Sequence, residues 1–258
     1  MQLDDRVILV TGAANGLGAG IVEALLSQGA RVVLGDINGR ALQDTTARLD
    51  ATGERTVGVV TDVTQAADVD RFVAAGVARF GRVDGLVNNA GVIHLGPALD
   101  ESAERLDFQL AVNLGGLFAC CKALARQLLI QGGNGAIVNI ASNAGKVGFP
   151  AMAGYNASKA AVINLTRTLA AEWAGSGISV NAVCPGSVET PMLRSVAEFL
   201  SRQSGEEPQT HFDRMVPAQL RRHIQPIEVG RVVAFLLSDD ATIIRGQSIN
   251  VDAGETPY

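Results

Sequence analysis

Several residue types are scarce in this chain of 258 residues. It contains three cysteines, three lysines and 11 aromatic residues, of which only two are tyrosines. The cysteines are odd in number, and neither they nor the three histidines show the spacing of metal ligands. We therefore expect no metal, and reduced thiols in a cytoplasmic protein. Because lysine and tyrosine are so rare, any specific pairing of the two is informative.

Long apolar runs and blocks of one charge are also missing. No uninterrupted apolar run approaches the ~18 residues of a membrane helix, and the acidic start from Met1 to Asp5 does not resemble a signal peptide. The net charge is −5, and no basic tail accompanies it. We therefore expect neither a membrane nor a nucleic acid as partner.

Glycine and aliphatic residues are abundant instead. The 29 glycines follow no three-residue period, which excludes collagen. A hydrophobic content of 47% is enough for a buried core and argues against disorder. The length fits one α/β domain or two small ones.

Short apolar runs alternate with helical periods along the whole chain. The runs predict strands at Arg6–Val10, Arg31–Leu34, Thr56–Val60, Gly85–Val87, Ala136–Ile140, Ile178–Val183 and Ser248–Val251. Helices are predicted at Leu17–Gln28, Gly39–Asp50, Gln65–Phe80, Glu101–Ile130, Ala153–Ala174 and Ile227–Leu237. This alternation predicts a single α/β domain over residues 1–258, a doubly wound parallel sheet of seven strands with helices on both faces.

The region 191–225 interrupts this pattern. It is polar and includes a turn-like stretch from Ser204 to Pro208. Loops beyond the carboxyl ends of parallel strands form ligand crevices, so we interpret the region as a substrate lid. A solvated insertion without a role is the alternative.

The first strand leads into a glycine-rich turn, Thr11-Gly12-Ala13-Ala14-Asn15-Gly16-Leu17-Gly18. Glycines before a helix let backbone N–H groups approach a pyrophosphate. The spacing G-x-x-x-G-x-G differs from the G-x-G-x-x-G dinucleotide pattern, and an ordinary structural turn would also explain it. Asp36 and Ile37 follow the second strand, where an acid binds a ribose 2′-hydroxyl. A carboxylate there repels a 2′-phosphate and favours NAD over NADP, although Asp36 could instead cap the next helix.

Tyr155 and Lys159 form the most informative pair. They stand four residues apart in a predicted helix and therefore share one face. A neighbouring ammonium favours the phenolate and should lower the tyrosine pKa, which makes Tyr155 a usable acid or base. A surface pair without a role is the alternative.

Taken together, these motifs resemble those of the short-chain dehydrogenase/reductase family. The resemblance rests on the glycine turn, Asn88-Asn89-Ala90-Gly91, Ser142, Tyr155-x-x-x-Lys159 and Pro185-Gly186, and it spans essentially the whole chain. It implies that Tyr155 is the general acid/base and that Ser142 binds the substrate oxygen. It also implies that Lys159 binds the nicotinamide ribose and that Asn113 holds a water in a proton relay.

The same resemblance implies a set of cofactor contacts around NAD. They comprise Gly12, Asn15, Gly16, Leu17, Gly18, Asp36, Ile37, Asp62, Val63, Asn88, Ala90, Gly91, Tyr155, Lys159, Pro185, Gly186, Val188 and Thr190. One departure is Val251-Asp252-Ala253-Gly254, where relatives often have two glycines. We expect this change to restrict the backbone slightly and to leave the resemblance to the family unaffected.

The expected function is therefore NAD-dependent interconversion of a secondary alcohol and a ketone. The charged residues of the lid favour a polyol, sugar alcohol or diol as substrate: Arg194, Glu198, Arg202, Glu206, Glu207, Arg221 and Arg222. The alternatives are a 3-oxoacyl thioester reductase, an epimerase or dehydratase of the longer branch of the superfamily, and a non-catalytic NAD-binding regulatory protein. The length argues against the longer branch, and the complete catalytic set argues against the non-catalytic protein.

The helix that carries Tyr155 also bears on assembly. Apolar residues spread around much of its circumference, which indicates cover on more than one side. The family is commonly tetrameric through such helices, so the resemblance implies a homotetramer. A dimer is the alternative.

Overall fold

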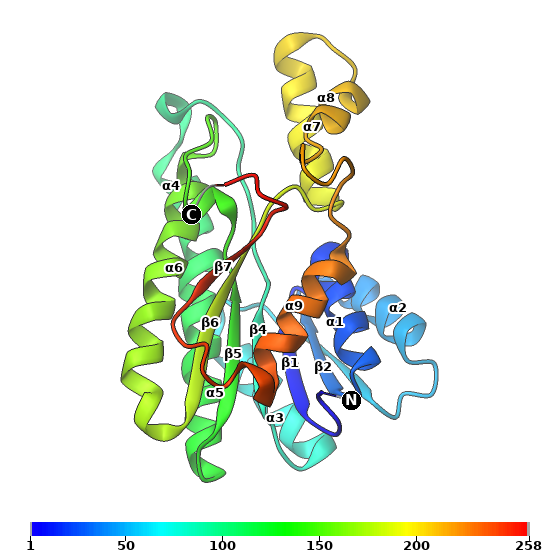
Figure 1. Ribbon diagram of the computed structural model, residues 1–258, viewed down its shortest axis with the longest axis vertical. Coiled ribbons are helices and arrows are strands. Elements are labelled where there is room, and N and C mark those ends of the chain that lie inside the picture. Colours follow the sequence, from blue (N-terminus) through cyan, green and yellow to red (C-terminus); the bar gives the residue numbers. More distant parts are fainter. Residues whose placement is uncertain (1, 257–258) are drawn as a thin grey trace.

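The computed structural model describes residues 2–256, so the terminal Tyr258 lies outside the described residues. Its centre is a sheet of seven parallel strands in the order β3-β2-β1-β4-β5-β6-β7 (Figure 1). The strands are β1 Val7–Thr11, β2 Arg31–Asp36, β3 Thr56–Val60, β4 Gly85–Asn88, β5 Gly135–Ile140, β6 Ile178–Pro185 and β7 Ser248–Val251. All seven predicted strands are confirmed within two residues at each end.

Nine α-helices are found in the described part of the chain. They are α1 Gly16–Ser27, α2 Gly39–Leu49, α3 Ala66–Phe80, α4 Ala103–Leu110, α5 Leu117–Ile130, α6 Ala153–Trp173, α7 Pro191–Ser204, α8 Pro208–Arg214 and α9 Pro226–Leu237. Short 3₁₀ turns lie at Ala98–Asp100, Asn143–Gly145, Ala174–Ser176 and Asp239–Ala241. The predicted lid region therefore contains two helices joined by a turn.

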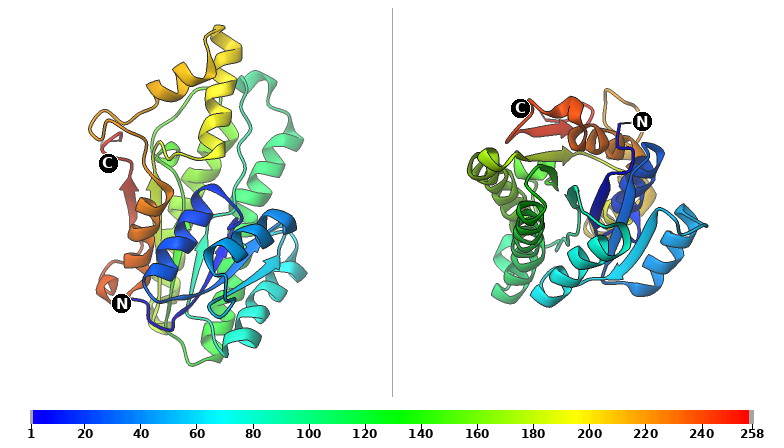
Figure 2. Two further views of the ribbon diagram at one scale, coloured as in Figure 1. Left: turned by 90° about the vertical axis from the view of Figure 1, so that its right-hand side faces the viewer. Right: turned by 90° about the horizontal axis from the view of Figure 1, so that it is seen from below.

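Helices cover both faces of the sheet, as predicted (Figure 2). Ile21 of α1, Leu42 of α2 and Val233 of α9 belong to the hydrophobic core on one face. Phe72 of α3 and Leu124 of α5 belong to the core on the other face, together with residues of α6. The central strands are apolar on both sides because both sides are covered; every residue of β1 is buried.

The long predicted helix Glu101–Ile130 is interrupted. A π-helical turn, Ala111–Gly116, separates α4 from α5. The whole stretch Ala103–Ile130 is long and apolar enough to cross a membrane by length and composition alone. This is weak evidence for a span, because core helices pass the same test and this stretch packs against α3 and α6.

The strand order places a crevice at the edge of the sheet that is formed by the carboxyl ends of the strands. The chain builds outward from β1 to β3 and then returns to place β4 on the other side of β1. Ligands of doubly wound sheets bind at such a switch point, beyond the carboxyl ends of the strands. The turns after β1, β4, β5 and β6 all open at this edge, and α7 and α8 stand above it (Figure 1).

Candidate active site

A large cavity occupies this edge of the sheet. It has a volume of about 1170 Å³ and extends from the glycine turn after β1 to the inner side of α7. Its lining includes 18 of the 20 residues predicted for the site: Gly12, Asn15, Gly16, Leu17, Gly18, Asp36, Ile37, Asp62, Val63, Ala90, Gly91, Ser142, Tyr155, Lys159, Pro185, Gly186, Val188 and Thr190. The fold thus brings residues from six turns to one place, although their contacts with a cofactor stay predictions.

The glycine turn is shaped by close backbone approach. Gly12 has φ +63°, and a Cβ on it would lie 2.8 Å from the Cα of Ala90. A Cβ on Gly18 would lie 2.0 Å from the carbonyl oxygen of Gly12. Neither position accepts a side chain without movement of the backbone, so the turn must be glycine at both.

Asn89 ties this turn to the end of β4. Its Nδ2 donates to the carbonyl oxygens of Thr11 and Gly12 at 3.1 and 2.8 Å. The Thr11 hydroxyl in turn accepts from the backbone N–H groups of Asn89 and Ala90, both at 3.1 Å. Sequence reasoning did not single out Asn89 or Thr11 as supports of the site, since their role depends on β1 and β4 being neighbours.

Asp36 is fixed at the carboxyl end of β2. Its Oδ2 accepts from the backbone N–H of Ala14 at 3.0 Å, and its Oδ1 accepts from that of Asn38 at 2.9 Å. Asn38, and not Asp36, caps α2 through its own side chain. The alternative that Asp36 caps this helix is therefore wrong. Asp36 instead lines the cavity.

Asn88 and Asn113 are the two predicted residues that do not line the cavity. The side chain of Asn88 is turned into the core, where its Nδ2 donates to Cys121 Sγ at 3.1 Å and to Asn139 Oδ1 at 2.9 Å. Its side chain is therefore not placed to contact a cofactor. The contact predicted for Asn88 is one of its backbone, at the place where the family's chain passes the adenine ribose, and it stays a prediction; the position at a strand end does not reveal which way the side chain points.

Asn113 lies in the π-helical turn and is 1% exposed. Its Oδ1 accepts from the backbone N–H of Val92 at 2.8 Å, and its Nδ2 donates to the Val92 carbonyl and to Ser158 Oγ at 2.9 and 3.0 Å. These bonds join the loop after β4 to α6. π-Helical turns often occur at functional positions of proteins. Here the turn places Asn113 where its side chain holds the loop after β4 against α6.

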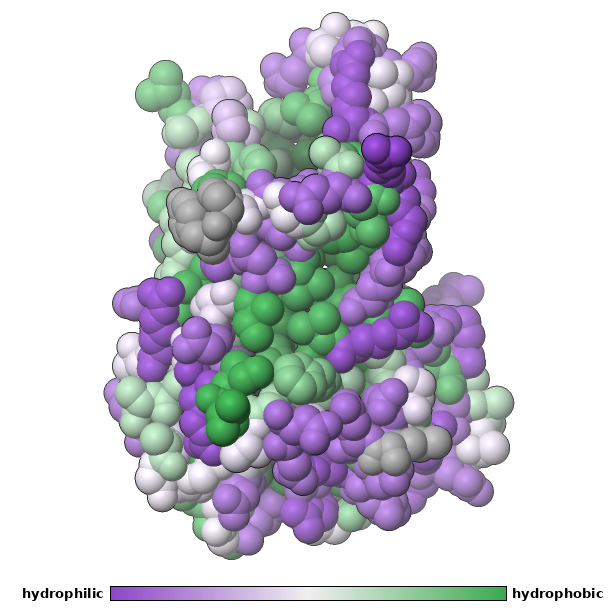
Figure 3. Space-filling model, viewed as in Figure 1, coloured by the Kyte–Doolittle hydropathy of each residue, from purple (hydrophilic) through white to green (hydrophobic). Residues whose placement is uncertain are grey.

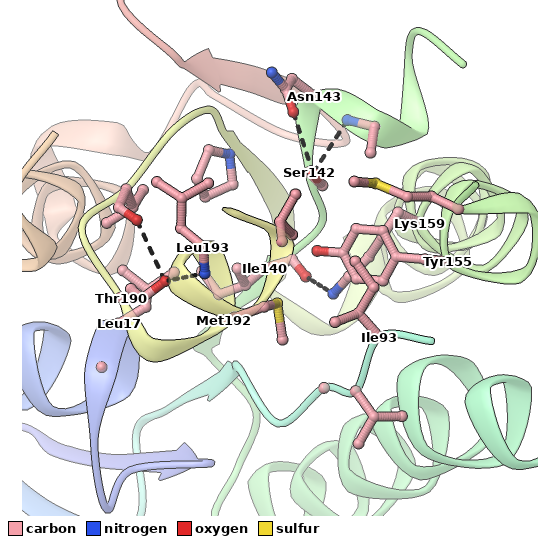
Figure 4. Close-up of a pocket in the computed structure, with 18 of the residues that line it drawn as sticks. Leu17, Ile93, Ile140, Ser142, Asn143, Tyr155, Lys159, Thr190, Met192 and Leu193 are labelled. Carbon is pink, nitrogen blue, oxygen red and sulfur yellow. Dashed lines mark hydrogen bonds between the residues drawn. The ribbon is translucent and has the colours of Figure 1, made fainter. Parts of the chain in front are cut away.

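Tyr155 and Lys159 project from α6 toward the cavity, and the Tyr155 hydroxyl points into it (Figure 4). Lys159 is 4% exposed, and its Nζ donates to the carbonyl oxygen of Ile140 at 2.8 Å. The Nζ lies 5.6 Å from the centre of the Tyr155 ring. The i,i+4 spacing thus places both groups at the same wall of the cavity, which excludes the alternative of a surface pair.

Burial controls the ionisation of this pair. It raises the pKa of Tyr155, and a hydrogen-bonding interaction with the Ser142 side chain opposes this in part. Burial also lowers the pKa of Lys159 to about 8. The expectation that the Tyr155 pKa is lowered is therefore wrong, because the effect of burial outweighs that of the hydrogen-bonding interaction with Ser142.

Ser142 stands at the end of β5 and caps the 3₁₀ turn that follows it. Its Oγ accepts from the Ala144 N–H at 3.1 Å and donates to Asn143 Oδ1 at 3.3 Å (Figure 4). Thr190 similarly caps α7, since its Oγ1 accepts from the Leu193 N–H at 3.3 Å. Both caps hold a hydroxyl at the cavity wall in a fixed position.

The departure at Ala253 has a structural consequence that the sequence did not indicate. Ala253 adopts φ +54°, in the left-handed region, and lines the cavity. This conformation costs a residue with a Cβ roughly 1–2 kcal/mol. The next residues form a compact turn in which Asp252 accepts from the N–H groups of Gly254 and Thr256 at 3.0 and 2.9 Å.

The charged residues of the lid region do not face the cavity. Within residues 2–256, none of the seven charged residues on which the polyol interpretation depended lines it. Arg194 pairs with Glu189 at 3.0 Å, and Arg222 pairs with Glu228 at 2.7 Å. Glu206 accepts two hydrogen bonds from Arg214 of α8. The inner side of the lid region is apolar instead.

Comparison with known proteins supports the same assignment as the geometry. The model of a family described as Enoyl-(Acyl carrier protein) reductase matches residues 12–256. The chain is 39% identical to the oxidoreductase UcpA of Salmonella typhimurium, over 99% of this chain and 96% of that protein. It is 38% identical to D-threitol dehydrogenase of Mycolicibacterium smegmatis, over 99% of this chain and 94% of that protein.

A solved structure shares the whole fold. A tryptophan-substituted variant of the actinorhodin polyketide ketoreductase, determined with NADPH, superposes with a TM-score of 0.93 at 39% identity, covering 98% of each chain. The strand order, the glycine turn beside Asp36 and the Ser142, Tyr155 and Lys159 side chains around one cavity agree with these likenesses. The chain therefore belongs to the short-chain dehydrogenase/reductase family of oxidoreductases, which bind a nicotinamide cofactor.

Proposed function

We propose that this protein is an NAD-dependent oxidoreductase that interconverts a secondary alcohol and a ketone, with Tyr155 as general acid/base. The observation that carries the proposal is the Tyr155 hydroxyl, which points into a cavity that Ser142 and Lys159 also line (Figure 4). The cofactor, when bound, takes a hydride from the substrate carbon or gives one to it. The protein then has to bind and orient both molecules and move one proton.

The lining of the cavity fits a nicotinamide dinucleotide. The backbone of the glycine turn, at the start of α1, offers N–H groups to a pyrophosphate, and Asp36 stands where a ribose would lie. Asp62 and Val63 border the same end, and Pro185, Gly186, Val188 and Thr190 border the region between the turn and Tyr155. We assign these residues to the adenine and the nicotinamide carboxamide respectively.

Asp36 supports NAD as the preferred form. Within the described residues, Lys159 is the only lysine or arginine that lines the cavity, so no cation there balances a 2′-phosphate beside the Asp36 carboxylate. The related ketoreductase structure contains NADPH, and a comparison of NADP with NAD as cosubstrate tests the role of Asp36 directly.

The catalytic side chains divide the proton chemistry. In oxidation, Tyr155 as phenolate takes the hydroxyl proton of the substrate; in reduction, Tyr155 as phenol returns it. Ser142 Oγ holds the substrate oxygen, and Lys159 contacts the nicotinamide ribose. Asn113 is assigned to the proton relay, through a water beside Lys159. A Cβ on Gly91 would lie 3.3 Å from Asn113 Oδ1 and 3.6 Å from Lys159 Nζ, so the absence of a side chain at Gly91 leaves space near both atoms.

The segment 191–225 is proposed as the substrate lid. Helices α7 and α8 pack on each other, and α7 forms one wall of the cavity. Three buried free cysteines among the described residues accord with a cytoplasmic location, which stays a prediction.

Two substrate classes have support from the comparisons. D-threitol dehydrogenase is a relative that acts on a polyol, in line with the polyol interpretation. The related structure is that of a polyketide ketoreductase, and the family description names an acyl carrier protein; both are in line with the alternative, reduction of a 3-oxoacyl thioester, although the reaction in the family description is that of an enoyl reductase. Because the charged lid residues do not line the cavity, they no longer support a polyol as substrate.

The proposed activity is tested by following reduced nicotinamide with a panel of secondary alcohols, polyols and hydroxy steroids, and with 3-oxoacyl thioesters in the reverse direction. Oxidation should accelerate from neutral to alkaline pH, since burial raises the pKa of Tyr155 and the phenolate forms only at high pH. Reduction should be favoured at neutral pH. No turnover of any compound, with NAD binding intact, would instead favour a non-catalytic NAD-binding regulatory protein.

We propose further that the protein is a homotetramer. Strand β7 is an edge strand that pairs only with β6 among the described strands, and hydrophobic residues gather on the face over β7 and α9 (Figure 3). A second surface lies on the outer side of α6, where Ala153, Ala157 and Ala160 are exposed, and on α5, where Phe118 is exposed. Two distinct self-complementary surfaces generate a tetramer, and one generates a dimer.

Light scattering at micromolar concentration checks this prediction. The expected mass is about four times the 26.8 kDa of one chain. A mass of twice one chain would reduce the assembly to a dimer, and the mass of a single chain would contradict self-association.

A further inference from the structure

The end of the cavity beneath the lid differs from the end beside the glycine turn. Its walls carry large apolar side chains from the loop after β5, from α7 and from the loop after α8. We call this part the lid chamber and define it by Phe149, Met152, Met192, Phe199, Leu200 and Met215. In Figure 3, hydrophobic residues line the hollow beside the lid helices.

Helix α7 presents an apolar stripe to this chamber. Met192, Val196, Phe199 and Leu200 follow the i, i+4, i+7, i+8 spacing of one helix face, and all four line the cavity. Only Val196 of these is buried. Such a stripe normally packs on the core of a domain, but here the space in front of it is the cavity.

Two side chains show that the chamber is open to an occupant. Leu200 is 36% exposed, and Phe149, from the loop after β5, is 38% exposed. Leaving large apolar side chains in contact with water is unfavourable, and an apolar ligand between them would remove that contact. A concave, largely apolar surface with few polar groups is the usual form of a small-molecule site.

Methionine is concentrated in this chamber. The chain has four methionines, and Met152, Met192 and Met215 are the three that lie within the described residues. All three line the lid chamber. Methionine side chains are flexible and polarizable and adapt to irregular apolar shapes, which suits a wall that closes on a bulky group.

The six residues that define the lid chamber are all Phe, Met or Leu and offer little to a ligand with many hydroxyl groups, although Asn143, Ser187 and Gln219 also line the cavity. Among the described residues, Glu255 is the only Asp, Glu, Lys or Arg that lines the cavity apart from Asp36, Asp62 and Lys159. Its carboxylate already accepts from the Ser187 N–H and Oγ at 3.1 and 3.0 Å and from Asn143 Nδ2 at 3.4 Å. Hydroxyl groups placed against Met192 or Leu200 would lose their hydrogen bonds to water without replacement.

We propose that the substrate is a secondary alcohol or ketone whose larger substituent is a bulky apolar group, a ring system or a chain of several carbons, seated in the lid chamber. This inference rests on the proposed function, since Tyr155 must define where the reacting carbon lies. It predicts that catalytic efficiency follows the apolar size of the substituent and that small polyols are poor substrates.

The test measures kcat/KM with NAD for a series from 2-butanol to 2-decanol, together with threitol. Each added methylene should raise kcat/KM about fourfold, corresponding to ~0.8 kcal/mol per buried CH₂, until the chamber is full. Threitol should fall at least a hundredfold below the best alkanol. Efficiency that is flat or falls with chain length, or a preference for threitol, would overturn the proposal while leaving the oxidoreductase function intact.

A matched pair of variants locates the effect. Leu200→Gln keeps the approximate size of the side chain but makes it polar, and should reduce the dependence on chain length. Ile130→Gln makes the same kind of change at a residue that is 79% exposed at the end of α5 and outside the cavity lining, so it should keep the wild-type dependence. Equal dependence in both variants would contradict the lid chamber. Failure of every alcohol and ketone, in contrast, would refute the proposed function itself.

Discussion

Replacement of Tyr155 by phenylalanine is expected to lower kcat by a factor of about 10²–10⁴ or more in both directions of the reaction, the contribution of a positioned acid/base. The change removes one hydroxyl and keeps the ring, so the packing of α6 is preserved. Because the hydroxyl points into the cavity (Figure 4), its loss leaves the proton of the substrate without an acceptor. Binding of NAD should be retained, since the glycine turn and Asp36 are untouched.

Three measurements make this prediction specific. Steady-state rates with the best alcohol give kcat, titration of protein fluorescence or calorimetry gives the Kd for NAD, and thermal unfolding reports stability. A loss of kcat together with an unchanged Kd assigns the hydroxyl to chemistry. A variant that keeps its rate within a few-fold of the wild type would show that another group moves the proton.

Replacement of Asp36 by alanine is expected to raise the ratio of kcat/KM for NADP to that for NAD roughly ten- to hundredfold. The two backbone N–H groups from Ala14 and Asn38 hold the Asp36 carboxylate in place. Two like charges a few ångströms apart near a protein surface repel each other. After screening, the free energy of this repulsion corresponds to a roughly ten- to hundredfold change in the ratio. The variant removes this repulsion and also removes the acceptor for the ribose hydroxyl groups, so its use of NAD should fall.

Asp44→Asn provides the matched control, because Asp44 is exposed on α2, outside the cavity lining, and its replacement also removes one negative charge. It should leave the cofactor ratio unchanged. An Asp36→Ala variant with an unaltered ratio, or a wild-type enzyme that already prefers NADP, would refute the role of Asp36.

The fold could be predicted because its signals are local. The strands are short apolar runs bounded by turns, and the helices repeat at 3.6 residues, so each element reveals itself in the sequence. The division of Glu101–Ile130 into α4 and α5 could not be predicted, since one additional residue in a π-helical turn hardly alters the hydrophobic pattern. The helices of the lid region were not predicted, because its many charged residues obscure the helical spacing of its apolar residues.

The candidate site was predictable where chemistry fixes the residue type, and less so where burial and direction decide. Gly12 and Gly18 must be glycine because a backbone atom occupies the space of a Cβ, and such requirements are visible in a sequence. The direction of the Asn88 side chain and the raised pKa of Tyr155 depend on packing by residues distant in the chain. The apolar stripe of α7 is visible in the spacing of Met192, Val196 and Phe199, although the charged residues of the same region favour a polar interpretation.

The most direct test of the central claim follows the hydrogen atom itself. The best alcohol of the panel is prepared with deuterium on its carbinol carbon and oxidised by the wild-type enzyme, and the reduced cofactor is analysed by mass spectrometry. We expect the deuterium to be transferred to the nicotinamide of NAD, in an amount equal to the ketone formed, and the transfer to be lost in Tyr155→Phe. Ketone formed without deuterium in the cofactor, or transfer that persists at the wild-type rate in Tyr155→Phe, would contradict this mechanism.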